Sequence, residues 1–131
     1  MPDRPDVVIL CVDRLTRVPL RAQLIEDGFE VIGTDSWPVM RTHLRPGRKP
    51  SFVIVDLQAL DNPEQLLNDV RVLMKPERVI VLTMLGSIDT DELRRRGFVV
   101  VRRPVSIGSI VEAARALRAR VTTETRSDRE R

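Results

Sequence analysis

The sequence is poor in aromatic residues, cysteine and histidine. Its 131 residues include three Phe, one Trp and no Tyr, so Val, Ile and Leu must build most of the core. The single cysteine, Cys11, excludes an intrachain disulfide, and its place inside an apolar run predicts a buried structural thiol. His43 is the only histidine, so the chain has no Cys/His cluster for zinc.

Long apolar runs are also missing. The longest, such as residues 7–12 and 79–82, are far too short to span a bilayer, and the first residues contain no apolar signal segment. We therefore expect a cytoplasmic protein with no membrane contact. The net charge is +3, but the arginines are scattered among 19 acidic residues. Because a nucleic-acid reader gathers its basic residues on one stripe, we expect no direct nucleic-acid binding.

Short apolar runs alternate five times with amphipathic segments. The runs are β-branched and do not alternate with polar residues, which is typical of parallel strands covered on both faces. They lie at residues 7–12, 29–32, 52–55, 79–82 and 98–101. Helices are predicted over 17–27, 37–44, 90–96, and from 63 and 106 onward. Their expected N-caps include Thr16, Ser36 and Asn62.

This alternation predicts one α/β domain over residues 1–121. The expected architecture is a three-layer sandwich with a five-stranded parallel sheet in the order 2-1-3-4-5, joined by right-handed crossovers. In the first helix, Val18, Ala22 and Ile25 are expected on the inner face. Residues 122–131 contain nothing apolar, so they are expected to form a charged, disordered tail.

Functional groups follow the predicted strands. The carboxylates of Asp13 and Asp56 come after the first and third strands, the hydroxyl of Thr83 after the fourth and the guanidinium of Arg103 after the fifth. The carboxyl ends of parallel strands meet at one edge of the sheet. A carboxylate there can attack a phosphoryl group, a second can hold Mg²⁺, and a hydroxyl and a cation can bind phosphoryl oxygens.

Four segments resemble the motifs of response-regulator receiver domains, which have a flavodoxin-like fold. They are residues 9–13, 52–56, 79–83 and 97–104. The resemblance implies Asp56 as phospho-acceptor, Thr83 and Arg103 as its partners, and Asp13 with Asp56 as an Mg²⁺ site. It also implies a non-enzymatic signalling domain whose partner is a histidine kinase or another signalling protein. Arg103–Pro104 is expected to be a cis bond.

Output in this family runs through the face of the fourth helix, fifth strand and fifth helix, often by homodimerisation. In this chain that face is expected to carry mixed charges, which could pair across a two-fold axis. They are Asp91, Glu92, Arg94, Arg95, Arg115 and Arg118.

Several positions depart from the family pattern. Arg14 follows Asp13 where receivers have a further carboxylate, which weakens any Mg²⁺ site. Arg103 replaces the usual Lys, and Met84 replaces a small residue after Thr83. Val100 replaces an aromatic switch residue.

Three functions remain open. The chain is a conventional receiver phosphorylated on Asp56, an atypical receiver or pseudo-receiver that works through protein contacts, or a flavodoxin-like binder of a small molecule or nucleotide. The last lacks support because residues 13–16 contain no Gly-rich phosphate loop.

Overall fold

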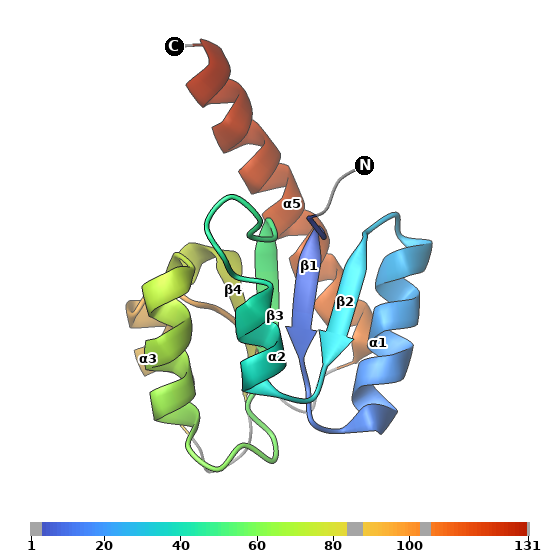
Figure 1. Ribbon diagram of the computed structural model, residues 1–131, viewed down its shortest axis with the longest axis vertical. Coiled ribbons are helices and arrows are strands. Elements are labelled where there is room, and N and C mark those ends of the chain that lie inside the picture. Colours follow the sequence, from blue (N-terminus) through green and yellow to red (C-terminus); the bar gives the residue numbers. More distant parts are fainter. Residues whose placement is uncertain (1–3, 84–87, 103–105, 131) are drawn as a thin grey trace.

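The computed structural model describes residues 4–83, 88–102 and 106–130, with side chains as far as Thr123, and it places a parallel sheet between two layers of helices (Figure 1). The strands are β1 (Val7–Leu10), β2 (Val31–Thr34), β3 (Phe52–Asp56), β4 (Val79–Leu82) and β5 (Val99–Val101). Their order is β2-β1-β3-β4-β5 and every pairing is parallel. The predicted α/β fold and strand order are confirmed.

Two sets of helices cover the two faces of the sheet. The helices are α1 (Arg14–Glu26), α2 (Trp37–Thr42), α3 (Pro63–Leu73), α4 (Thr90–Arg95) and α5 (Ile107–Glu130), with a 3₁₀ turn, η1, at Pro76–Arg78. Alternate strand residues divide between the faces: Ile54 packs toward α1 and α5, whereas Val55 packs toward α2, α3 and α4. Burial on both faces explains why the central strands are continuous apolar runs.

Two Gly-Phe pairs end helices in the same way. The N–H of Gly28 bonds to the carbonyl of Ile25, and the N–H of Phe29 reaches back to Leu24. Gly97 and Phe98 repeat this pattern after α4, and both glycines have a φ above 90°. These are Schellman ends, in which the residue after the glycine belongs to the cap. The strands predicted to begin at residues 29 and 98 therefore begin two and one residues later, at Val31 and Val99.

The inner face of α1 differs from the prediction. Leu20 and Leu24 are its buried residues, while Val18 and Ile25 are 52% and 44% exposed. The helix starts at Arg14 with Asp13 as its N-cap, three residues before the predicted start, and Thr16 is not the cap. The predicted and the observed inner faces of α1 are both apolar, and the packing of the helix decides which one faces the sheet.

The segment expected to form a disordered tail is part of a helix in the structure. Helix α5 continues through Glu130, so residues 122–130 are helical (Figure 1). No Gly or Pro follows Gly108 in the sequence. Once the first turns of α5 have packed on the sheet, each further residue adds a hydrogen bond without a new nucleation cost. Among the described helices, none is long and apolar enough to cross a membrane.

The central strand offers a test of this packing. Ile54 is fully buried in β3, whereas Val72 on α3 is 82% exposed. Ile54→Ala should lower the free energy of unfolding by about 2–5 kcal/mol, because it removes buried methyl groups and leaves a cavity. Val72→Ala, an apolar truncation at the surface, should change it by less than about 0.5 kcal/mol. Urea unfolding measures both, and equal effects would contradict the assigned core.

Candidate functional site

Asp56 is the last residue of β3 and is fully buried. Its Oδ1 accepts a 2.9 Å hydrogen bond from the N–H of Gln58, which forms a tight turn at the end of the strand. Its Oδ2 lies 3.4 Å from the Sγ of Cys11, which donates to it. The structure thus places the carboxylate of Asp56, the predicted phospho-acceptor, at the carboxyl edge of the sheet, where the N–H of Gln58 and the thiol of Cys11 are two of its contacts.

Cys11 is the residue across from Asp56. Strands β1 and β3 pair with Val7 opposite Phe52 and Leu10 opposite Val55, so the next pair is Cys11 and Asp56. The thiol is fully buried, as predicted, and also lies 3.3 Å from the carbonyl oxygen of Asp13. Burial, helped by the negative charge of Asp56, raises the pKa of Cys11 to about 12. The thiol therefore stays protonated at neutral pH and acts as a donor.

The carboxylate of Asp13 is engaged with the helix that follows it. Its Oδ1 accepts a 3.0 Å hydrogen bond from the N–H of Leu15, and its Oδ2 accepts one of 3.0 Å from the hydroxyl of Thr16. Only residues 11–13 separate β1 from α1, so Asp13 is already the N-cap of the helix. It therefore stabilises the first turn of α1, where a negative charge is also favoured by the helix dipole.

The oxygens of this short connection already accept hydrogen bonds. The guanidinium of Arg17 donates to the carbonyl of Cys11 at 2.7 Å and, more weakly, to that of Val12 at 3.4 Å. The carbonyl of Asp13 accepts from the N–H groups of Thr16 and Arg17. Together with the Asp13 carboxylate bonds, every carbonyl and carboxylate oxygen of residues 11–13 has a donor.

The Mg²⁺ that the resemblance implies does not fit this donor set. Mg²⁺ requires several oxygen ligands in near-octahedral geometry and has little affinity for a thiol. Here Asp56 faces a protonated thiol, while the second predicted ligand, Asp13, caps α1. Within the described part of the chain, no three His, Cys, Asp or Glu residues are grouped to hold a metal.

The other predicted site residues lie on neighbouring strand ends or outside the described residues. Thr83 is buried directly after β4, and its N–H donates to the carbonyl of Val101. The N–H of Leu57 bonds to the carbonyl of Leu82, which keeps the ends of β3 and β4 adjacent. Arg103, Met84 and the Arg103–Pro104 bond lie outside the described residues.

Sequence reasoning missed Cys11 as a member of the site. The sequence did contain a usable signal. The first and third apolar runs begin at residues 7 and 52, and counting along both strands in parallel from these residues pairs position 11 with Asp56. The prediction relied instead on the first carboxylate after the strand, which is Asp13. The strand ends at Leu10, before that carboxylate, so the register and not the residue type decides which side chain faces Asp56.

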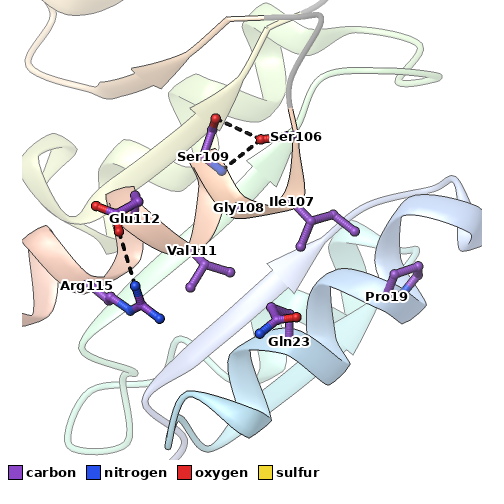
Figure 2. A pocket seen from close by; sticks show the side chains of 9 residues that line it. All are labelled: Pro19, Gln23, Ser106, Ile107, Gly108, Ser109, Val111, Glu112 and Arg115. Atoms are coloured by element: carbon purple, nitrogen blue, oxygen red, sulfur yellow. Dashed lines mark hydrogen bonds and ion pairs between the residues drawn. The ribbon is translucent and has the colours of Figure 1, made fainter.

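A pocket of about 610 Å³ lies between α1 and α5, and Pro19 and Gln23 of α1 are among the residues that line it (Figure 2). Asp13, Asp56 and Thr83 are not among the residues that line it. Its polar side chains, such as Gln23 and Glu112, are exposed, and Ser106 and Ser109 bond to each other at the start of α5. It therefore has no buried polar group to orient a ligand.

No protein-family model matches the chain, and no curated protein sequence matches it. Solved structures do. A protein described as adenylate cyclase from Rhodopirellula baltica has a TM-score of 0.78 and 19% identity, with 98% of this chain and 96% of that chain covered. NtrX from Brucella abortus has a TM-score of 0.76 and 18% identity, with 98% and 29% covered.

A response regulator from Thermotoga maritima has a TM-score of 0.67 and 24% identity, with 87% of this chain and 97% of that chain covered. At 18–24% sequence identity, the similarity between this chain and these structures concerns the fold alone. The structure and these neighbours together show that the chain has the receiver fold.

The capping role of Asp13 can be tested by substitution. Asp13→Ala should lower the free energy of unfolding by about 1 kcal/mol, because two groups of α1 lose their acceptor. Asp13→Asn should stay close to the original protein, since Asn caps helices as well as Asp does. Urea unfolding with and without Mg²⁺ makes the comparison. The cap assignment would be contradicted if Asp13→Asn were as unstable as Asp13→Ala. It would also be contradicted if Mg²⁺ stabilised the original protein but not Asp13→Asn.

Proposed function

We propose that the chain is an atypical receiver-like signal-transduction domain that works through protein contacts and not through Mg²⁺-assisted phosphorylation. Asp56 stands at the strand end, in the position at which a conventional receiver would be phosphorylated. The observation that carries the proposal is the pairing of buried Asp56 with the thiol of Cys11, where a metal site needs another oxygen ligand. The partner is a histidine kinase or another signalling protein.

Phosphoryl chemistry explains why this pairing matters. A phosphoryl group brings further negative charge to a carboxylate that is already buried, and receivers neutralise that charge with a cation. In this chain the thiol is neutral, and the guanidinium of Arg17 is directed to backbone carbonyls of the β1–α1 connection. Hydrogen bonds within the chain thus close the β1–α1 connection, which supports a domain whose conformation does not depend on a phosphoryl group.

The face formed by α4, β5 and α5 is the proposed contact surface. Strand β5 is an edge strand of three half-buried valines, and α4 presents the exposed charges of Asp91, Arg94 and Arg95. Unpaired sheet edges and adjacent helices are common places for partners to bind.

Two residues expected on that face point elsewhere. Arg115 makes an ion pair with Asp27 at the end of α1, and Arg118 lies over the ring of Phe29. Both are directed toward the α1 side of α5. The surface available to a partner is therefore carried mainly by α4 and β5.

The small-molecule alternative finds no support at the start of α1. Phosphate groups bind where helix N-termini present free N–H groups. Here the Asp13 carboxylate accepts the N–H of Leu15, and the carbonyl of Asp13 accepts those of Thr16 and Arg17. A negative charge already occupies the place that a nucleotide phosphate would take.

Beryllofluoride with Mg²⁺, which imitates an acyl phosphate, tests the proposal directly. Amide NMR spectra of the full chain should show no saturable shift of the residues next to Asp56, and acetyl phosphate should add no mass. A conventional receiver under the same conditions is the positive control. An Mg²⁺-dependent response that disappears in Asp56→Asn would overturn the proposal and make the chain a phosphate-controlled receiver.

Homodimerisation through α4 and β5 gives a second test. Light scattering at high protein concentration should show a dimer, and Arg94→Glu should weaken it about tenfold, because a cation in a face of mixed charges is reversed in both copies. Arg71→Glu on the exposed side of α3 is the matched control and should have no effect. A monomer at every concentration would rule out a homodimer and leave a different protein as the partner.

A further inference from the structure

We propose that a basic groove, at the edge of the sheet where the strands begin, binds an acidic segment of a partner protein. The groove is formed by the end of α2, the turn that follows it and the end of α3 (Figure 1). It lies at the opposite edge of the sheet from Asp56. This surface is additional to the α4–β5 face of the proposed function. The residues that line it include Arg41, Arg45, Lys49, Leu73 and Lys75.

The sequence concentrates positive charge in the segment that builds most of this groove. Residues 36–55 contain Arg41, Arg45, Arg48 and Lys49 and no acidic residue. They hold four of the chain's 22 basic residues and none of its 19 acidic residues, so the rest of the chain has a net charge of −1. The net positive charge of the protein therefore resides in this one segment.

A tight turn holds two of these cations close together. The N–H of Arg48 bonds to the carbonyl of Arg45 at 3.0 Å, with Pro46 and Gly47 between them. Gly47 has a φ of 82°, and this order of Pro and Gly is typical of a type II β-turn. The backbone itself thus keeps the two arginines near each other, without an acidic side chain between them.

Lys49 joins this turn to the end of α3. Its Nζ donates a 2.6 Å hydrogen bond to the carbonyl of Leu73, the last residue of the helix, where the helix dipole favours a positive charge. Two hollows, of about 320 and 220 Å³, share Leu73 as a lining residue. Arg41 and Arg45 line the larger hollow. Lys49 and Lys75 line the smaller one, so cations stand on both sides of an aliphatic side chain.

The described acidic residues leave these cations without ion pairs. In the described part of the chain, no carboxylate pairs with Arg41, Arg45 or Lys75, whereas each arginine of residues 94–96 pairs with an acidic side chain. Glu77 is close to Lys75 in the sequence, but its carboxylate lies beside the connection between α4 and β5. Cations gathered in this way repel one another, and the carboxylates of a partner would relieve that repulsion.

The lining of the groove selects the class of partner. Arginine binds carboxylates with paired N–H groups. Leu44, Pro38 and Pro46 line the larger hollow together with Leu73, which suits an apolar side chain of the partner. None of the described residues that line the two hollows is aromatic, whereas grooves for single-stranded nucleic acid carry aromatic side chains for base stacking. The groove therefore fits an acidic protein segment with an apolar side chain among its carboxylates.

The experiment measures binding of a short fluorescein-labelled peptide, in which Glu residues flank a Leu-Leu pair, to the full-length protein by fluorescence anisotropy. The original protein should bind it saturably. Arg41→Glu/Arg45→Glu should weaken binding at least about tenfold, because both cations of the larger hollow are reversed. Arg14→Glu/Arg21→Glu makes the same change of charge at exposed positions of α1 and is the matched control. It should stay within about twofold of the original protein, because charges on the other face of the sheet are screened.

Further controls separate docking from folding. Both double variants should unfold in urea at the same midpoint as the original protein, because the exchanged side chains are exposed. Should the groove variant with Glu fail to fold, Arg41→Gln/Arg45→Gln removes the two cations without adding acids and should still weaken binding. A peptide with Ser-Ser in place of Leu-Leu should bind more weakly than the first peptide, because it leaves the aliphatic lining exposed to water.

Three outcomes would overturn the proposal. The first is the absence of saturable peptide binding, and the second is equal weakening by the groove variant and the α1 variant, which would indicate attraction by net charge alone. The third concerns a single-stranded oligonucleotide and vesicles that contain phosphatidylserine, both measured at the same ionic strength. If either one binds more tightly than the peptide and loses its binding in Arg41→Glu/Arg45→Glu, the partner belongs to that class. None of these results depends on Asp56, so the proposed function is decided separately.

Discussion

The parallel register between β1 and β3 is the constraint on which the site depends. It places every buried residue of β1 opposite a buried residue of β3, from Val7 and Phe52 to Leu10 and Val55. A shift by one residue would turn each side chain to the other face and expose the core, so the register is fixed by burial. The pairing of Cys11 with Asp56 is therefore a consequence of core packing along the whole strand.

The three-residue connection between β1 and α1 adds a second constraint. A carboxylate at the start of a helix can cap the first turn or serve a ligand beside the strand ends, and in this chain Asp13 does the first. The hydroxyl of Thr16 and the guanidinium of Arg17 complete the closure of the loop. The carbonyl and carboxylate oxygens of residues 11–13 thus all accept hydrogen bonds from nearby groups of the chain.

The architecture could be predicted from the sequence, because it follows from local patterns. Unalternating β-branched runs identified the strands, and Ser36 and Asn62 were correctly identified as helix caps. Asp56 also could be placed at the strand end, because β3 is a fully buried strand that ends in this residue.

The errors arose where tertiary packing decides between equal local choices. Val18 and Ile25 are as apolar as Leu20 and Leu24, and the packing of α1 on the sheet decides which pair is buried. Cys11 gave no signal by residue type, since a thiol in an apolar run is ordinarily core. Its role depends on a partner 45 residues away in the sequence.

Hydrogen bonds contribute to the stability of the buried Asp56 carboxylate. A charge in a low-dielectric interior is expensive unless hydrogen bonds compensate for it. Asp56 receives the N–H of Gln58 and faces the thiol of Cys11, whose raised pKa keeps its proton in place. This arrangement suits a single negative charge. These contacts stabilise Asp56 in its present form, and the proposed signalling through the surface of the domain would leave them unchanged.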